Sequence, residues 1–293
     1  MEQLKHKAGA RRPAASPAEI TIVKSTGERE AFDPSKLEAS LVRAGASAIA
    51  RTEIMSRVTR ELRDGMTTAQ IYRHAFSLLK RMAEHPVAAR YSLRRAVMEL
   101  GPAGFSFEKF VAEIFKEMGY STKTDLIVRG GCVEHEVDVA AWTSKKLIFV
   151  EAKFHNSLGV KSDVKVALYV KARFDDLIGR TFDLGGERKL DEGWLLTNTK
   201  FTTTAVEYGL CQGLRMIGWN YPDKGNLQDL IQESGLHPIT SLTSLSNKEK
   251  SDLLKQGIVL ARTLRDEPGH LAALGQPTGK IKSVLREIEG LLA

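Results

Sequence analysis

The sequence predicts an α/β protein built of three folded parts. Residues 20–32 read as two short strands around a turn, and a series of helix start signals follows them. Farther along, the continuous apolar run at 147–150 comes after the alternating segment 135–139, which indicates a buried sheet. From Gln228 onward the chain turns to short helices and turns. We therefore expect an N-terminal β-hairpin with helices, a central sheet, and a small all-α C-terminal unit.

The composition is that of a folded protein without a membrane anchor. Of 293 residues, 42% are hydrophobic and 27% charged, a balance that disordered chains lack. No apolar run approaches the ~20 residues of a membrane span, and the N-terminus has no apolar signal core. Cys132 and Cys211 alone cannot build a disulfide framework or a zinc ribbon. We therefore expect a cytoplasmic protein that has no membrane partner.

The formal net charge of +7 is consistent with a polyanionic partner such as DNA. Part of this charge lies in residues 1–18, a stretch rich in proline and alanine that also carries Lys5, Lys7, Arg11 and Arg12. We expect residues 1–18 to form a disordered basic tail.

Residues 19–101 are predicted to form the first domain, a β-hairpin followed by four helices. Residues 20–24 alternate as in a strand, residues 25–28 supply a turn, and the second strand returns to Phe32. Four helix start signals follow, namely Asp33 with Pro34, Thr52, Thr67 with Gln70 at capping-box spacing, and Pro86. We expect the first two helices to end at Gly45 and Gly65, and the last helix to run to Leu100.

A second pattern in this domain consists of residues spread from the hairpin to the last helix: Ile22, Val23, Lys24, Gly27, Phe32, Asp33, Lys36, Leu37, Met66, Thr67, Thr68, Ile71, Arg90, Tyr91, Ser92 and Leu93. The pattern resembles the ATP-cone, a nucleotide-binding regulatory module. The resemblance implies ATP or dATP as a regulatory ligand, bound by Val23, Lys24, Lys36, Thr68 and Arg90. The chemistry agrees, because lysines attract phosphates and helix N-termini offer free backbone N–H groups.

Two features limit the nucleotide chemistry of the chain. Ser25 stands where the ATP-cone commonly carries a second basic residue, directly after the hairpin lysine. Gly279 and Lys280 are followed by Ile281, which does not complete a P-loop. A P-loop motor is therefore not expected.

The central segment brings acids and a lysine onto two neighbouring strands. Successive side chains of a strand point to opposite faces, so Glu136 shares a face with Asp138, and Glu151 shares one with Lys153. Three carboxylates and an ammonium can then converge on one spot. Such oxygen ligands suit Mg²⁺ or Mn²⁺, and a lysine beside the activated water suits hydrolysis of a phosphodiester. The alternative is a solvated face on which acids pair with lysines across strands.

Further pieces of sequence surround these strands in a fixed order. A helix pattern carrying Glu108 precedes them, and a strand, the sequence T-N-T-K-F-T at 197–202 and a helix follow. Residues 105–219 thereby resemble the PD-(D/E)xK nucleases, most closely the Mrr-like restriction endonuclease domain. The resemblance implies a restriction-endonuclease-like mixed sheet flanked by helices over residues 102–222. Val137 stands where the proline of the family's motif would be.

The resemblance also implies catalytic roles. Asp138 and Glu151, with the carbonyl of Ala152, would bind Mg²⁺, and Lys153 would orient or deprotonate the nucleophile. Glu108 and Glu136 would be more distant ligands or ligands of a second metal ion. Glu136 could equally pair with a nearby lysine.

DNA contacts are expected from two places near these strands. His155 and Asn156 directly follow the second strand, where they can touch the scissile phosphate, although a lone histidine near a loop is more often solvated. A helix predicted over 163–177 places Tyr169 and Arg173 one turn apart on a single face. The alternative is a helix packed by Val164, Ala167, Leu168 and Phe174 with its charges in water.

Residues 223–293 are predicted to form a helical C-terminal domain. The segment 253–259 has a helix-hairpin rhythm that partly recurs over 274–292. It resembles a helix-hairpin-helix unit, which offers backbone N–H groups to DNA phosphates without reading sequence. Val259 stands where a second glycine would help, and the alternative is a packing or dimerising extension.

The combined order of domains predicts a Mg²⁺-dependent DNA endonuclease with a nucleotide-binding regulatory domain, in defence or DNA repair. Cutting both strands with one site per chain favours a homodimer. One alternative is a non-catalytic, nucleotide-sensing DNA-binding regulator. Another is a structure-selective nuclease for branched DNA.

Overall fold

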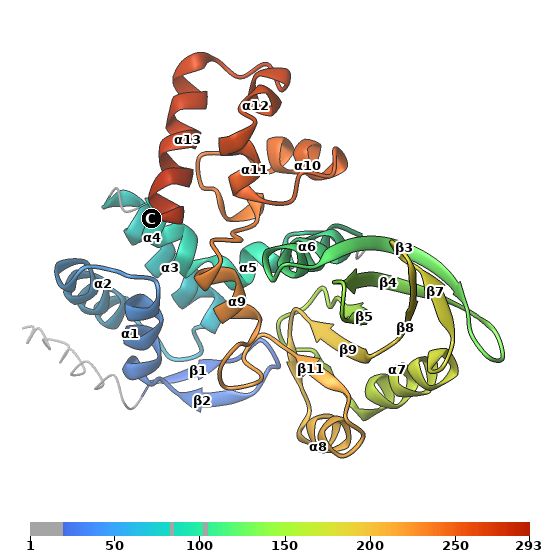
Figure 1. The fold of residues 1–293 in the computed structure, drawn as a ribbon. Coiled ribbons are helices and arrows are strands. Elements are labelled where there is room, and N and C mark those ends of the chain that lie inside the picture. Colours follow the sequence, from blue (N-terminus) through green and yellow to red (C-terminus); the bar gives the residue numbers. More distant parts are fainter. Residues whose placement is uncertain (1–19, 83–84, 102–104) are drawn as a thin grey trace, which may run out of the picture. The chain divides into compact units, whose positions relative to one another are not determined.

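A computed structural model describes residues 20–82, 85–101 and 105–293 (Figure 1). The chain divides into two compact units, residues 1–82 and 83–293, each of which is described by itself. The tail predicted at 1–18 lies outside the described residues. None of the helices in the described part of the chain is long and apolar enough to cross a bilayer.

The first unit is a two-stranded hairpin with three helices. Strand β1 (Thr21–Val23) pairs antiparallel with β2 (Arg29–Ala31). The helices are α1 (Pro34–Arg43), α2 (Ala48–Glu61) and α3 (Thr68–Arg81). Their buried core consists of Ile22, Phe32, Leu37, Leu41, Ile54, Ile71 and Leu79, among others.

Two of the predicted helix starts in this unit are confirmed, and one is wrong. Asp33 caps α1, and Thr67 forms a capping box with Gln70 at α3. The second helix does not open at Thr52 but at Ala48, because the Ser47 side chain accepts from the backbone N–H of Ala50. The Thr52 hydroxyl instead donates to the Ala48 carbonyl from inside the helix, at 3.0 Å. This helix also ends at Glu61, ahead of the predicted stop.

The second unit opens with two short helices where one was predicted. These are α4 (His85–Tyr91) and α5 (Leu93–Met98). The break falls at Ser92, whose φ and ψ of −87° and 2° leave the α-helical region and whose hydroxyl donates to the Ala89 carbonyl. The predicted single helix from Pro86 to Leu100 is therefore wrong in its continuity.

A five-stranded mixed sheet forms the centre of the second unit, in the order β11-β9-β5-β4-β3. Strands β3, β4 and β5 are antiparallel, and β5, β9 and β11 are parallel. The bounds are β3 (Ser121–Arg129), β4 (Glu134–Trp142), β5 (Leu147–Lys153), β9 (Glu192–Thr197) and β11 (Arg215–Ile217). This confirms the mixed sheet that the resemblance implied.

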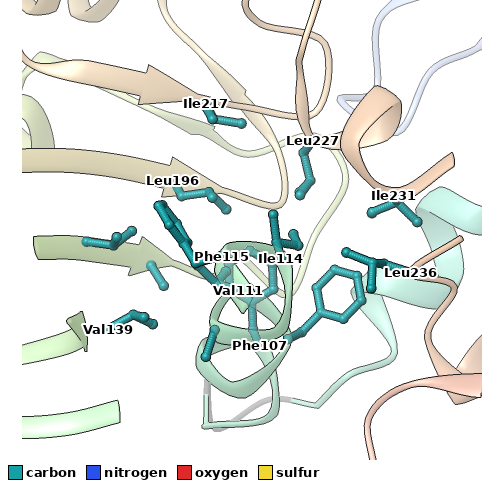
Figure 2. Packing of buried hydrophobic residues seen from close by; sticks show 14 of the residues in the cluster. Phe107, Val111, Ile114, Phe115, Val139, Leu196, Ile217, Leu227, Ile231 and Leu236 are labelled. Carbon is teal, nitrogen blue, oxygen red and sulfur yellow. The ribbon is translucent and has the colours of Figure 1, made fainter. Parts of the chain in front are cut away.

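Helices cover both faces of the sheet. On one face α6 (Phe105–Glu117) buries Phe107, Val111, Ile114 and Phe115 against Val139, Leu196 and Ile217 (Figure 2). On the other face α7 (Val164–Leu177) and α8 (Thr203–Cys211) pack on Ala140, Phe149, Leu195 and Met216. Side chains alternate between the faces, which is why the apolar run at 147–150 is buried throughout. Two small sheets are added, β6 (Lys161–Ser162) with β10 (Lys200–Phe201), and β7 (Thr181–Asp183) with β8 (Glu187–Lys189).

The C-terminal part is helical, as predicted, and has a core of its own. Its elements are α9 (Leu227–Glu233), the 3₁₀ turn η2 (Ile239–Ser241), α10 (Asn247–Lys255), α11 (Ala261–Asp266), α12 (Gly269–Ala273) and α13 (Thr278–Leu292). The core includes Leu253, Leu264, Leu271 and Ile288, and Ala89 of α4 belongs to it. Helix α13 packs so closely on α4 that a Cβ at Gly290 would lie 2.7 Å from Pro86. DNA binding by this helical part stays a prediction.

Candidate active site

Asp138 and Glu151 meet where β4 and β5 separate. The pairing runs from Trp142 opposite Leu147 to Val139 opposite Val150, so the next positions along the two strands are Asp138 and Glu151. Beyond that point the two strands no longer pair through their backbones. The backbone N–H of Ala152 donates instead to Oδ2 of the Asp138 side chain, at 2.7 Å. The register predicted from side-chain alternation therefore brings the two acids together.

Helix α6 adds a third carboxylate to this site. The pKa of Glu108 is raised to about 8, mainly by burial and then by the negative charges of Asp138, Asp125 and Glu136. Burial also raises the pKa of Asp138, against the hydrogen bond from Ala152, which lowers it. The pKa of Glu151 is raised to about 7, mainly by burial and then by the charge of Asp138. Mutually repelling carboxylates of this kind gain from a bound cation.

Asp125 of β3 is a member of this cluster that the sequence analysis did not identify. It falls between the pairs Thr124–Val139 and Leu126–Val137, hence level with Asp138, and it hydrogen-bonds to Glu108. Among the described residues it is the one non-glycine residue with a positive φ, at 55°. Aspartate is uncommon inside strands and tolerates this conformation, so an acid in an otherwise alternating strand was the available signal.

Arg173 of α7 contacts Glu151, the acid at the end of β5. Its guanidinium forms an ion pair with Glu151 and also donates to the Glu136 carbonyl at 3.0 Å. It hydrogen-bonds to the Tyr169 hydroxyl and stacks 4.7 Å from the centre of that ring. The side chains of Arg173 and Glu151 are only 13% and 15% exposed. The predicted pair of DNA contacts is thus brought together, with Tyr169 exposed and Arg173 turned toward the carboxylates.

The donor set suits a hard divalent cation, but its members do not yet surround one. Within residues 20–82, 85–101 and 105–293, no three His, Cys, Asp or Glu side chains are close enough to hold a metal ion as they lie. Asp138, Glu151 and the Ala152 carbonyl are oxygen ligands of the type that Mg²⁺ prefers. Arg173 contacts one oxygen of Glu151, Oε2, and so shares this acid with any metal ion bound there.

The remaining predicted site residues follow the same two strands. Lys153 and Glu136 are both exposed, and Lys153 has no ion pair within the described part of the chain. His155 is held in place by two contacts. Its backbone N–H donates to Asn198 Oδ1 at 2.8 Å, and its ring Nε2 lies 2.9 Å from the Ser162 hydroxyl. Asn156 is exposed.

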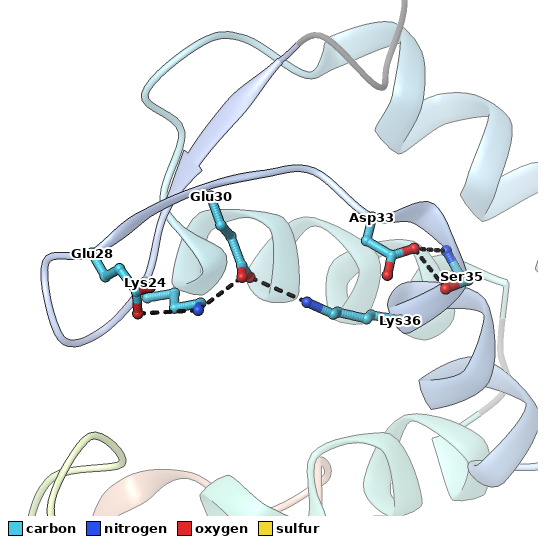
Figure 3. A network of polar contacts seen from close by, with 6 residues as sticks. All are labelled: Lys24, Glu28, Glu30, Asp33, Ser35 and Lys36. Carbon is cyan, nitrogen blue, oxygen red and sulfur yellow. Dashed lines mark hydrogen bonds and ion pairs between the residues drawn. The ribbon is translucent and has the colours of Figure 1, made fainter.

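The first unit gathers part of the predicted nucleotide site. Lys24 Nζ lies 2.8 Å from Glu30 and 3.1 Å from Glu28, and Lys36 Nζ lies 3.4 Å from Glu30 (Figure 3). Val23 donates its N–H to the Met66 carbonyl at 3.0 Å, next to the capping box at which Thr68 begins α3. Both lysines are thus paired with glutamates, and exposed pairs of this kind contribute little stability.

Arg90 has a different environment in the second unit. Its Nη1 donates to the carbonyls of Gly290 and Leu291, at 3.2 Å and 3.5 Å. A cation here offsets the partial negative charge at the C-terminus of α13. The structure therefore gives this arginine a contact with the last helix, and its role in nucleotide binding stays a prediction.

Comparison with known families divides the chain into three matched segments. An ATP cone domain matches residues 20–99, a restriction endonuclease domain matches 102–219, and an AF1548-like C-terminal domain matches 237–292. These matches confirm the predicted order of an ATP-cone followed by an Mrr-like nuclease domain. The first match crosses the division between the two compact units, since α4 and α5 lie in the second unit.

Two similar proteins align with this chain over nearly their whole length. A protein of Archaeoglobus fulgidus described as uncharacterized is 33% identical over 183 residues, which is 62% of this chain and 99% of that protein. The crystal structure of AF1548, a protein of unknown function, aligns with 33% identity and a TM-score of 0.52 over 64% of this chain and 97% of that one. The restriction endonuclease MspJI in complex with a 27-mer oligonucleotide aligns at 15% identity and a TM-score of 0.32, over 73% of this chain and 46% of that one.

Proposed function

Because the chain belongs to the family of the Archaeoglobus fulgidus protein and carries an ATP cone domain and a restriction endonuclease domain, we propose that it is a Mg²⁺-dependent DNA endonuclease whose activity responds to ATP or dATP. The observation that carries this proposal is the meeting of Asp138 and Glu151 where β4 and β5 separate, with Lys153 beside them. Phosphodiester hydrolysis needs such acids and such a base at one place.

Asp138, Glu151 and the Ala152 carbonyl would hold the metal ion. Bound there, Mg²⁺ or Mn²⁺ would polarise the phosphate and favour ionisation of the attacking water. Lys153 would orient or deprotonate that water and offset negative charge in the transition state. Glu108 and Glu136 would assist from α6 and β4, and Glu108 is joined there by Asp125.

The pKa values of Glu108 and Glu151 bear on their proton states near neutral pH. With a pKa of about 8, Glu108 is mostly protonated at neutral pH and can keep a hydrogen bond to Asp125. Glu151 is about half ionised at pH 7 despite its partner Arg173. A divalent cation would displace these protons, so binding of Mg²⁺ should release protons into solution near neutral pH.

The decisive test is cleavage of supercoiled plasmid by purified protein with Mg²⁺ or Mn²⁺. The wild type should nick or cut the plasmid, and Lys153→Ala should lower the rate at least about a hundredfold while DNA binding persists. Lys116→Ala, on the far end of α6 and paired with Glu113, is the matched control and should cleave normally. A wild type that binds DNA and never cuts it would refute the nuclease proposal.

A second candidate is a nucleotide-sensing DNA-binding regulator without catalysis. The contact of Arg173 with Glu151 favours it, because a permanent guanidinium could replace the metal ion at that acid. Isothermal titration with Mg²⁺ separates the two: a regulator of this type would show no heat of binding that depends on Asp138. A nuclease selective for branched DNA is distinguished by comparing junction and linear substrates.

Assembly and biological role extend the same proposal. We propose a homodimer, since cutting both strands of DNA requires two sites and each chain offers one. Light scattering during gel filtration, with and without DNA, measures this directly. A role in defence or DNA repair fits a nuclease that responds to nucleotide levels.

A further inference from the structure

Two lysines lie side by side on a small sheet close to the candidate active site. Strand β6 pairs parallel with β10, and this register sets Lys161 directly opposite Lys200. Both lysines are exposed, and neither forms an ion pair within the residues that the structure describes. Like charges at directly opposite positions of a sheet repel each other. A bound anion would relieve this repulsion.

Arg94 of α5 adds a third cation from the other side. Its guanidinium carbon lies 5.8 Å from the centre of the Trp219 ring. The backbone N–H of Trp219 in turn donates to the Thr199 carbonyl at 2.7 Å. That contact places Arg94 next to the strand that carries Lys200. Burial lowers the pKa of Arg94, and the charges of Arg94 and Lys161 act with burial to lower the pKa of Lys200. The guanidinium nevertheless keeps its charge at neutral pH.

One atom of Arg94 is left with an unmet hydrogen bond. Its Nε is buried and has no partner among the described residues. A buried polar N–H without a partner costs free energy, which a bound acceptor would recover. Asp163, which directly follows β6, is engaged as the cap of α7, accepting from the N–H groups of Lys165 at 3.1 Å and Val166 at 3.3 Å.

A polar path connects these cations to the candidate active site. Lys153 lies opposite Thr197 in the pairing of β5 with β9. Two residues later, His155 Nε2 contacts the hydroxyl of Ser162, which directly follows Lys161. Positive side chains therefore follow one another from Lys153 through Lys161 and Lys200 to Arg94. A group of cations of this kind suits the phosphates of a nucleic-acid backbone.

We propose that Arg94, Lys161 and Lys200 bind a backbone phosphate of the DNA strand, next to the phosphate that is cleaved. This site rests on the proposed function in that DNA is taken as the substrate. The guanidinium of Arg94 and the two lysines supply the positive charge, and Arg94 is held over Trp219 as it does so. The site would read no sequence, because phosphates carry none. It also gives α5, inside the ATP cone match, a direct contact with the nucleic acid.

The test is equilibrium binding of a fluorescein-labelled duplex, followed by anisotropy in EDTA at several salt concentrations. Arg94→Met keeps the aliphatic stem over Trp219 and removes the charge. Lys161→Ala and Lys200→Ala alter exposed positions and should fold normally. Each variant should bind about tenfold more weakly, and the slope of log Kd against log salt should fall by about one for the triple variant. The control is Arg95→Met, a neighbouring exposed arginine that is paired with Glu99 and should bind as the wild type does.

Omitting metal separates this inference from the nuclease proposal. If the three variants bind DNA as tightly as the wild type, the phosphate site is refuted even when the wild type cleaves plasmid. If they bind weakly and the wild type never cleaves, the site stands and the nuclease proposal fails. Titration with ATP in place of DNA provides the last comparison. Loss of ATP binding in the variants with unchanged DNA binding would overturn the assignment to DNA, whereas unchanged ATP binding with weakened DNA binding supports it.

Discussion

The hairpin of the first unit and the strand ends of the second use the same kinds of charged residue with opposite results. At the hairpin Lys24, Glu30 and Lys36 alternate in sign, and hydrogen bonding from Lys24 holds the pKa of Glu30 below its ordinary value. At the ends of β4 and β5, burial raises the pKa of Asp138 and Glu151 in spite of Arg173 nearby.

The contrast shows that burial, more than the presence of a cation, decides how a carboxylate behaves here. A network open to water satisfies its own charges and gains little free energy from doing so. Acids withdrawn from water keep an unmet demand for positive charge. We therefore expect the hairpin to exchange ligands with little effect on folding, and the strand ends to respond strongly to metal ions and pH.

The largest expected effect is loss of cleavage when a buried acid is neutralised. Asp138→Asn keeps the shape and removes a metal ligand, so the plasmid cleavage rate should fall by about a thousandfold or more. Glu30→Gln is the matched change at the hairpin and should leave the rate, measured without nucleotide, within about twofold. Equal losses in both variants would erase the distinction between the two clusters.

A second effect concerns stability against pH without metal ions. Glu108 and Glu151 have folded pKa values of about 8 and about 7, above the ordinary 4.5, so the folded state binds their protons more tightly. Stability from this source is complete below pH 4.5 and is lost as the pH rises through 7 and 8. Glu151 alone corresponds to a loss of about 2 kcal/mol between pH 5.5 and pH 8.5, and Glu108, discounted for solvent screening, adds to it, so we expect a loss on the order of 2–4 kcal/mol and a clearly lower Tm at pH 8.5.

Scanning calorimetry in EDTA and in Mg²⁺ measures this directly. Mg²⁺ should recover most of the lost stability at high pH, because it replaces the protons. Glu108→Gln and Glu151→Gln should each flatten the pH dependence. A Tm that stays level from pH 5.5 to 8.5 in the wild type would show that burial does not raise these pKa values.

Arg173 provides a smaller and more specific test. Its charge lowers the pKa of Glu151, so Arg173→Met should raise that pKa further. We expect the rising limb of the pH–rate profile to move upward by on the order of one pH unit, with the maximum rate reduced less than in Asp138→Asn. Arg180→Met, an exposed arginine just beyond α7, is the control. An unmoved profile would mean that Arg173 leaves the site when metal and DNA bind.

The smallest effect is expected at the hairpin. ATP should raise the Tm of the wild type by about a few degrees, and Lys24→Ala should remove that rise while leaving the Tm without nucleotide nearly unchanged. The control is Arg29→Ala, a change on the same hairpin that breaks the ion pair of Arg29 with Asp64. This variant should retain the response to ATP. A response that persists in Lys24→Ala would place the nucleotide elsewhere in the chain.

Local patterns in the sequence were enough to place the two acids of the candidate active site and many of the elements. Alternation along two strands put Asp138 beside Glu151, and short-range capping chemistry identified Asp33 and Thr67 as helix starts. The start of the second helix was harder to predict, because the hydroxyls of Ser47 and Thr52 can both act as an N-cap. In the structure Ser47 is the cap. Loops and helix boundaries depend on such small differences in free energy.

Contacts between residues distant in sequence could not be predicted in this way. Arg173 reaches Glu151 because α7 packs on the sheet, and Arg94 reaches Trp219 only once α5 has packed on the nuclease core. Asp125 takes a positive φ in a strand whose sequence gives no glycine as a warning. The partners of each cation, and hence the choice between paired and free charges, come from tertiary structure.

The helices at 85–98 have a consequence for how this protein can be recombined. Leu93 and Val97 are buried in the core of the endonuclease domain, Ala89 in the core of the C-terminal helices, and Arg90 holds the end of α13. An exchange of modules at the border between the matched families, near residue 100, would cut these shared interiors and leave apolar surface on both products. A chimaera joined near residue 83 keeps both cores intact, because α4 and α5 then stay with the sheet and the C-terminal helices on which they pack.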